Sequence, residues 1–373
     1  MYINGKLMLK DTIVANIIDN YIEIVEKDLC PLYFTKNKDI ESWLRMRAID
    51  SHRTHSRLIK KALRIKRTDD IGAVLKFNAA TITDCYWIKL DNEDLSWNDI
   101  RFKDNKYSEL ALKGDFKAIF QEESRTPELT NIGSFEKCWK QDGEGNWWLY
   151  KDGTNKELYS ELFVNKLGLK LGFDMANYEL EDNYVKSKDF TNNGELTLEL
   201  MRVLMEDEDD FEDNFKKLYS ISEEIAKDYI KMIYLDTLSY NVDRHTENYG
   251  LLRDSNTGEI LKLAPNFDNN LSLISRNQET YSEGFISYFT NFMKENDKAN
   301  KMFHELEIPK LNQEDISKIV NSIDIKLEEK DYKAIENIVL GSQEILFDRL
   351  ELETNKSLLD MEKKLKKNKE YER

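Results

Sequence analysis

The chain has 373 residues, enough for two or three domains, and its 40% hydrophobic and 34% charged residues are typical of a globular protein with a highly charged surface. The net charge of −16 argues against nucleic acid as a direct partner, because binding a phosphate backbone needs clustered Lys and Arg. No apolar run approaches the roughly 18–20 residues that cross a bilayer, and the N-terminus lacks a signal-peptide pattern, so we expect a cytoplasmic protein without membrane contact.

Residues 1–100 are expected to form an N-terminal extension. Residues 44–75 are rich in Lys and Arg, and residues 57–65 have the apolar spacing of a helix. This basic segment is either a solvated helix face, which we favour, or a site for a phosphate-bearing partner. Residues 82–90 fit a strand or a core segment. Three isolated cysteines suggest neither a zinc site nor a disulfide framework: Cys30, Cys85 and Cys138.

Residues 101–195 are expected to form a small β-rich lobe. Gly133 opens a run that leads to a polar turn at 141–146 and a strand at 147–151. Such a unit can lay backbone N–H groups over phosphates, although the chain has no Walker A motif.

A helix and two short strands complete this lobe. The helix at 155–167 has an apolar stripe and is ended by Gly168. Its two glutamates, Glu157 and Glu161, lie one turn apart. The two strands are expected at 177–180 and 183–188.

Residues 196–355 are expected to form a mostly helical lobe, and residues 356–373 a charged tail with a frayed end. An acidic stretch at 206–212 is a linker or a helix start. The long helix at 222–240 has the broad apolar face of a buried helix. Three more helical stretches follow, with a break at Pro309, and are expected at 288–306, 312–323 and 330–353.

The segment from 235 to 272 organises the chain. Asp243 is followed five positions later by Asn248, and protein kinases use this spacing for an aspartate that receives the substrate hydroxyl proton and an asparagine that holds magnesium. Strands at 249–253 and 259–263, joined by a turn, would return the chain and bring Asp268 beside Asn248. The alternative is an Asx-rich turn between a helix and a hairpin. We favour the phosphoryl-transfer site because spacing, hairpin and second aspartate agree.

This segment resembles the HipA-like kinases, bacterial serine/threonine kinases related to protein kinases and phosphoinositide kinases. The resemblance is carried by Asp243, His245, Asn248 and the Pro-Asn-Phe-Asp run at 265–268, and it extends over roughly residues 125–345. It implies an α+β, bilobal protein-kinase-like fold that uses ATP and Mg²⁺. It also implies a protein substrate with a Ser or Thr acceptor and allows for an antitoxin as partner.

The resemblance implies a catalytic set of four residues. Asp243 orients the acceptor hydroxyl and takes its proton, while Asn248 and Asp268 hold magnesium. Lys151, at the end of its strand, contacts the ATP phosphates. His245 borders this site and is interpreted as a packed support of the loop in preference to a general base.

The remaining nucleotide contacts are expected from the β-rich lobe and the helix after it. Glu157 would pair with the phosphate-binding lysine, and Glu161 is the fallback, which we regard as more typical of an ordinary exposed glutamate. The loop over the phosphates contributes Gly133, Ser134 and Lys137. Backbone groups near Val185, Lys186 and Asp189 would bind adenine.

Two further features bear on regulation and on the acceptor. HipA-like kinases autophosphorylate a serine in the phosphate loop, which implies Thr130 as the matching position and Ser134 as an additional candidate. Arg244 either stabilises developing charge or forms a salt bridge. Phosphoinositide kinases share the Asp-Arg-His sequence, so the acceptor class stays open.

Three functions therefore remain under consideration. The first is a HipA-like serine/threonine protein kinase, with a toxin role in a toxin–antitoxin pair. The second is a phosphotransferase acting on a small molecule or lipid headgroup. The third is a pseudokinase or nucleotide-binding scaffold, against which the complete Lys–Asp–Asn–Asp set argues. No helix-turn-helix is evident, so any contact with DNA would come through a partner.

Overall fold

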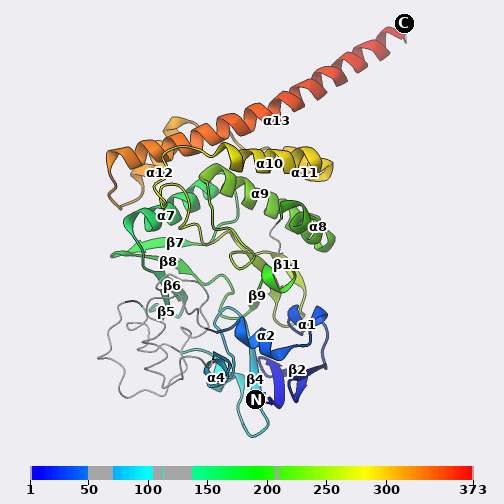
Figure 1. Cartoon of the computed structure of the whole chain (residues 1–373), viewed down its shortest axis with the longest axis vertical. Coiled ribbons are helices and arrows are strands. Elements are labelled where there is room, and N and C mark those ends of the chain that lie inside the picture. The colour runs from blue at the N-terminus through cyan, green and yellow to red at the C-terminus, as the bar shows by residue number, and fades with distance from the viewer. Residues whose placement is uncertain (1, 49–69, 104–111, 113–136, 206–209, 372–373) are drawn as a thin grey trace. The chain divides into compact units, whose positions relative to one another are not determined.

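The computed structural model describes residues 2–48, 70–103, 112, 137–205 and 210–371, with side chains described as far as residue 350. These residues divide into two compact units, each built from three segments of chain. Figure 1 labels the helices and strands of both units. The first unit comprises Met1–Thr154, Met175–Asp209 and His245–Phe267. The second comprises Asn155–Asp174, Asp210–Arg244 and Asp268–Arg373. The expected domain boundaries stay predictions.

The first unit begins with a four-stranded antiparallel sheet in the order β3-β2-β1-β4. Ile18 pairs with Tyr21, and the two residues between them, Asp19 and Asn20, both have positive φ, of 49° and 72°. This is the geometry of a tight hairpin turn, which Asp and Asn tolerate. The four strands are β1 (Gly5–Leu9), β2 (Thr12–Ile18), β3 (Tyr21–Ile24) and β4 (Tyr86–Leu90).

Short helices accompany this sheet. They are α1 (Tyr33–Lys36), α2 (Ile40–Arg45), α4 (Asp70–Leu75) and α5 (Trp97–Ile100). The expected strand or core segment at 82–90 is confirmed, because β4 is a strand and Trp87 and Ile88 at its centre are fully buried. The basic helix expected at 57–65 lies outside the described residues.

A second antiparallel sheet has the order β5-β6-β8-β7. The expected hairpin at its start is confirmed, and Asp142 fixes the turn: its carboxylate accepts the N–H groups of Glu144 (2.9 Å) and Asn146 (2.8 Å) and the indole N–H of Trp148 (2.9 Å). The two short strands expected after the helix are also present. The strands are β5 (Lys137–Gln141), β6 (Trp147–Lys151), β7 (Tyr178–Glu181) and β8 (Tyr184–Lys188).

A third sheet, in the order β11-β10-β9, contains the hairpin predicted after Asn248. Leu251 pairs with Leu263, and the prediction is confirmed to within one residue at each strand. The strands are β9 (Leu196–Leu200), β10 (Gly250–Asp254) and β11 (Ile260–Leu263), and the 3-10 helix η3 (Met201–Val203) follows β9.

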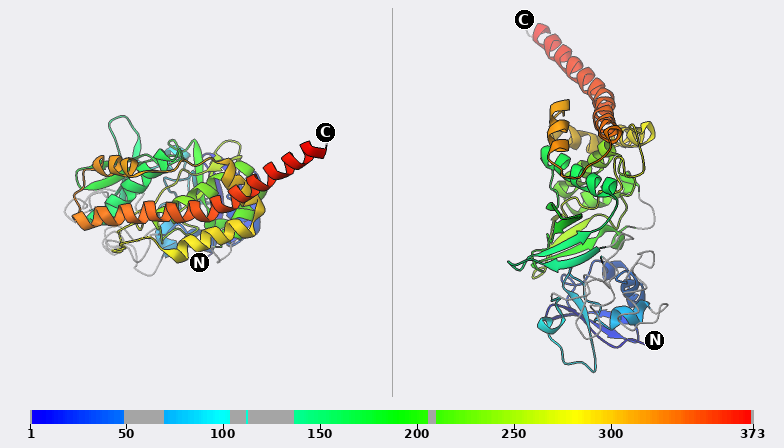
Figure 2. Two further views of the ribbon diagram at one scale, coloured as in Figure 1. Left: turned by 90° about the horizontal axis from the view of Figure 1, so that it is seen from above. Right: turned by 90° about the vertical axis from the view of Figure 1, so that its left-hand side faces the viewer.

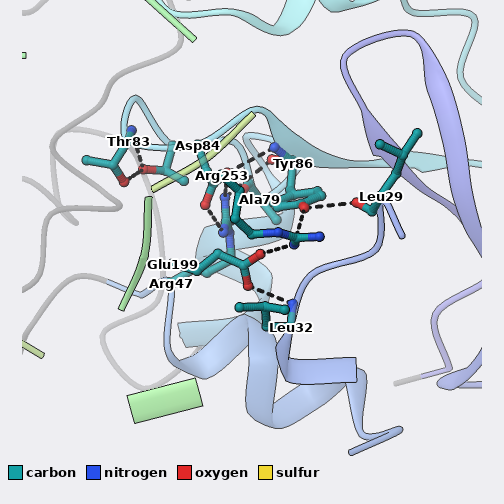
Figure 3. Close-up of polar contacts among 10 residues, drawn as sticks. Leu29, Leu32, Arg47, Ala79, Thr83, Asp84, Tyr86, Glu199 and Arg253 are labelled. Atoms are coloured by element: carbon teal, nitrogen blue, oxygen red, sulfur yellow. Dashed lines mark hydrogen bonds and ion pairs between the residues drawn. The ribbon is translucent and has the colours of Figure 1, made fainter. Parts of the chain in front are cut away.

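Arg253 of β10 joins this third sheet to the N-terminal segment (Figure 3). Its buried guanidinium forms an ion pair with the buried Glu199 of β9 and donates to the carbonyl of Cys30 (3.0 Å). The other Glu199 oxygen accepts the Leu32 N–H (2.7 Å). A second buried pair in the same region joins Arg47 to Asp84 (2.7 Å). Buried charges persist only when paired and hydrogen-bonded, so these contacts make residues 28–32 an integral part of the unit.

Gly258, in the turn between β10 and β11, makes this packing possible. Its φ is +74°, and a Cβ atom there would lie 1.9 Å from the carbonyl oxygen of Asp28. We expect Gly258→Ala to lower the free energy of unfolding by about 2–4 kcal/mol, because strain and a backbone clash add. Thermal unfolding measures this loss. Gly143→Ala, in open space, is the matched control and should change stability by under about 1 kcal/mol; equal effects would contradict the account.

The second unit is helical. Within it, α13 packs against α9 and α10, and its C-terminal part runs beyond them (Figure 2). The helices are α7 (Asn155–Lys170), α8 (Phe211–Ile221), α9 (Glu223–Ser239), α10 (Glu283–Glu295), α11 (Asp297–Glu305), α12 (Gln313–Asn321) and α13 (Glu329–Tyr371). None of the described helices has the length and hydrophobicity needed to span a membrane.

Three helix boundaries differ from those expected. Helix α7 passes through Gly168 and ends with a Schellman motif at Gly172 (φ 77°), in which Phe173 N–H donates to the Gly168 carbonyl (2.9 Å). The single helix expected at 288–306 is two helices, because Asn296 ends α10 and its side chain caps α11. The tail expected to fray continues as helix α13 to Tyr371.

Candidate functional site

Helix α9 leads directly to the loop with Asp243. Ser222 caps its N-terminus, and Tyr240 ends it in the left-handed conformation (φ 51°). The Asn241 side chain then holds the loop: its amide donates to Asp236 (2.9 Å) and its oxygen accepts the Asp243 N–H (3.1 Å). Asp243 is thus fixed four residues beyond the end of a buried helix.

Arg244 is buried and forms an ion pair with Asp236, so its charge is not exposed to solvent. Its Nε lies 2.9 Å from Asp236 Oδ2, with side-chain exposures of 6% and 2%. Burial lowers the pKa of Arg244, but Asp236 and, more weakly, Asp268 and Glu161 outweigh it and raise the pKa above its usual value. Of the two roles considered for Arg244, the salt bridge is the one that the structure contains.

The segment around Asp268 belongs to the same polar cluster of the second unit. Arg244 Nη2 donates to Asn269 Oδ1 (2.7 Å), and Asn269 N–H donates to Glu161 Oε1 (3.0 Å). Asp268 itself is half-buried and has a φ of 63°. Asp adopts this left-handed conformation more readily than most residues, and such conformations gather at functional sites. The Asp243–Arg244 loop and the Asp268–Asn269 segment are therefore connected through Arg244.

His245 and Asn248 lie in the first unit, in a tight turn before β10. The Asn248 N–H donates to the His245 carbonyl (2.8 Å), and His245 Nδ1 accepts the Glu247 N–H (3.3 Å). An ion pair between Arg202 and Glu247 holds the turn against η3. These bonds favour the interpretation of His245 as a support of the loop. Asn248 is 7% exposed, so its side chain is held within the fold.

Lys151 ends β6, a central strand of the second sheet. It is buried, at 7% exposure, and its ammonium lies 5.6 Å from the ring centroid of Tyr178. It pairs with Lys137 on β5 and with Val185 on β8. A buried lysine at the end of a strand has the character expected of a phosphate-binding residue, because its charge is held in place with little water around it.

The other nucleotide-binding residues have mixed outcomes. The phosphate-loop residues Thr130, Gly133 and Ser134 lie outside the described residues. Val185 and Lys186 lie within β8, and Asp189 directly follows it. The Lys186 ammonium binds Glu181 (2.6 Å) and Glu179 (3.3 Å), and its backbone lies in an inner strand, paired with Tyr150 of β6 and Glu179 of β7. Their roles stay predictions.

Glu161 is the residue that sequence reasoning undervalued. It is 1% exposed, and the interpretation as an ordinary exposed glutamate is wrong. Glu157 is half-buried on the same helix. The available signal was the position of Glu161 directly before the apolar pair Leu162 and Phe163, on the buried side of the helix. Asp236 lies within the apolar run of α9, and its burial was likewise not predicted.

We expect Glu161→Ala to lower the free energy of unfolding by about 1–3 kcal/mol, because the buried Asn269 N–H loses its acceptor. Glu157→Ala is the matched control and should change it by under about 1 kcal/mol. Urea unfolding of both variants measures the difference. A larger loss for Glu157→Ala would contradict this assignment.

The expected magnesium site needs only two protein ligands. Among the described residues, no group of three or more His, Cys, Asp and Glu side chains could hold a metal ion. An asparagine and an aspartate suit magnesium nonetheless, because this ion keeps waters and nucleotide phosphates as its other ligands. The half-buried Asp268 at positive φ fits this role. The meeting of Asn248 and Asp268 around one ion stays a prediction.

Comparison with solved structures identifies the fold. HipA of Shewanella oneidensis, in a complex of HipA, HipB and operator DNA, is similar with a TM-score of 0.54 and 12% identity, over 92% of this chain and 99% of HipA. The kinase CtkA of Helicobacter pylori gives a TM-score of 0.48 and 18% identity, over 59% of this chain and 94% of CtkA. No family model and no curated protein matches the sequence. The chain thus has a HipA-like, kinase-like α+β fold, as expected.

Proposed function

We propose that the chain is an ATP-dependent kinase of the HipA-like type, which transfers the γ-phosphate to a Ser or Thr hydroxyl of a protein. The observation that carries the proposal is the cluster of Arg244 with Asp236 and Asn269. It connects the loop with Asp243 to the segment with Asp268, the two carboxylates that phosphoryl transfer needs in this fold. A merely structural Asx turn would not need a buried cation to join two acidic segments.

Each residue then has a defined task. Asp243, held by Asn241, orients the acceptor hydroxyl and accepts its proton. Lys151 binds the nucleotide phosphates from its buried strand end, and Glu157 supports it in the proposal. Asn248 and Asp268 would hold Mg²⁺, which neutralises charge on the phosphates when bound.

The structure gives no added reason to prefer a small molecule or lipid headgroup as acceptor. The feature that left this open was Arg244 in the Asp-Arg-His sequence. Its guanidinium is directed to Asp236 and Asn269, so it is engaged within the fold and not presented to an acceptor. A protein hydroxyl therefore remains the preferred acceptor.

A toxin role with an antitoxin partner belongs to the same proposal. Its support is the HipA structure, which contains HipB and operator DNA. Contact of this chain with DNA would come through such a partner, because its net charge is −16. The described fold gives no separate support for this role.

The acceptor is tested by incubating the full chain with γ-labelled ATP, Mg²⁺ and a lysate of heat-treated bacterial proteins. The proposal predicts label in a discrete protein band that is absent with Asp243→Asn. Label recovered only in small soluble molecules or lipid would favour the second function. ATP binding without any transfer would favour the scaffold.

Autophosphorylation of the phosphate loop is expected as well, at Thr130 or Ser134. A phosphate group adds close to two negative charges, which would repel the phosphates of ATP. Intact mass after incubation with ATP and Mg²⁺ should show one added phosphate, which Thr130→Ala or Ser134→Ala removes. An unchanged mass in a preparation that phosphorylates other proteins would reject this expectation.

A further inference from the structure

The first unit contains a cavity of about 360 Å³, and none of the proposed kinase residues that the structure describes lines it. Its walls come from the residues directly before β4, from α5 and the residues after it, from the β5–β6 hairpin, and from the segment between β8 and β9. Its volume is in the range of pockets for small molecules.

The cavity is separate from the expected phosphate site. Trp147 lines the cavity at the first residue of β6, whereas Lys151 is the last residue of this strand. Four residue steps along a strand span roughly 13 Å, and Gly145 in the turn of the same hairpin also lines the cavity. A ligand here would therefore occupy the end of the hairpin opposite to Lys151.

Aromatic rings form much of the wall. Trp147 and Phe102 are buried, and Trp97 is half-buried. Exposed amides, from Gln141 and Asn193, lie among the lining residues. Large aromatic faces with a few polar groups favour a ligand with a planar apolar body.

The lining charge favours an anion, although the whole chain is acidic. Arg101 is exposed, and among the described residues no carboxylate pairs with it. Lys103 also lines the cavity and is exposed, but it has an interaction partner of its own. The carboxylate of the wall, Asp84, is neutralised by Arg47, which contacts it at 2.7 and 2.9 Å.

The remaining titratable group of the wall is a thiol. Burial raises the pKa of Cys85 to about 12, so this group is uncharged at neutral pH. Its Sγ lies 3.3 Å from the Gly194 carbonyl, which closes the wall at this point. Among the described lining residues, Arg101 is therefore the charged group that an anion can approach.

We propose that this cavity is a binding site for a small anion with a planar aromatic body, such as an aromatic carboxylate, sulfonate or phosphate ester. The rings of Trp97 and Trp147 contact the planar body. Arg101 binds the anionic group through charge-assisted hydrogen bonds. The site is independent of the nucleotide site and does not depend on the proposed kinase activity.

The test is a fluorescence titration of the full chain with 1-anilinonaphthalene-8-sulfonate, a planar aromatic sulfonate. Arg101→Glu should weaken its binding by about tenfold or more, because the ligand loses a charged hydrogen bond and meets a like charge. Arg45→Glu is the matched control, since Arg45 is also an exposed arginine of the first unit but does not line the cavity, and binding should be unchanged.

A second variant tests the cavity without a change of charge. Gln141→Trp, on the edge strand β5, should fill part of the cavity and weaken binding of the probe several-fold. The thermal midpoint of this variant should stay near that of the parent chain. Saturating Mg²⁺ and ATP should not displace the probe. Equal affinity in Arg101→Glu and the parent chain, full displacement by Mg²⁺ and ATP, or no binding at all would overturn the proposal.

Discussion

Asp268→Asn is expected to lower the rate of phosphoryl transfer by about a hundredfold or more while the fold stays intact. The substitution removes the negative charge that would hold Mg²⁺ and keeps the size of the side chain. Asp268 has a φ of 63°, and Asn is among the few residues that adopt this conformation readily. The loss of activity should therefore not be accompanied by a loss of stability, as it would be for Ala at this position.

The initial rate of γ-phosphate transfer at several Mg²⁺ concentrations measures this effect. Asp182→Asn is the matched control, because Asp182 also has a positive φ, of 55°, but lies exposed in the turn between β7 and β8. It should retain the parental rate. A parental rate in Asp268→Asn, with an unchanged Mg²⁺ requirement, would remove Asp268 from the site.

Arg253→Met is expected to have the largest effect on stability, a loss of about 3–5 kcal/mol in the free energy of unfolding. The change leaves Glu199 as a buried charge without its cation. It also removes the donor to the carbonyls of Cys30 (3.0 Å) and Gly258 (2.9 Å). Residues 28–32 and the β10–β11 turn would lose the side chain that binds both.

Urea unfolding measures this loss, and Arg349→Met is the matched control. Arg349 forms an ion pair with Glu283 (2.6 Å), but the two side chains are 32% and 59% exposed. Such surface pairs contribute about 0–1 kcal/mol, so the control should be nearly neutral. Adding Glu199→Leu to Arg253→Met should recover part of the loss, because no unpaired charge remains. A loss for Arg253→Met no larger than that of the control would contradict the role of the Arg253 network.

Local patterns predicted several elements that carry the proposed site residues or adjoin them in sequence. The hairpin of β10 and β11, the hairpin of β5 and β6, and helix α9 all have signals within a short window of sequence. A polar turn between two strands, or a broad apolar face on a helix, was enough to define them. The N-terminal hairpins had an equally local signal, in turns at Lys10–Asp11 and Asp19–Asn20, but were not recognised.

Other features depend on contacts between distant residues. The buried Glu161 accepts a hydrogen bond from the Asn269 N–H, 108 positions away. Arg253 is buried because residues 28–32 and Glu199 surround it. No window of sequence contains such pairs, so burial of a charged residue is the property that sequence reasoning predicts least well. The predicted ends of α7 and α10 were wrong because residues near Gly172 and Asn296 were equally plausible ends.

The most direct test of the central claim is Mg²⁺-dependent consumption of ATP by the purified full chain, compared with Asp243→Asn, with ATP binding measured in parallel. The account predicts consumption that EDTA abolishes, a loss of about a hundredfold or more in Asp243→Asn, and ATP binding retained in both proteins. ATP binding without consumption in the parent chain, or the same rate in both proteins, would contradict a catalytic role for Asp243.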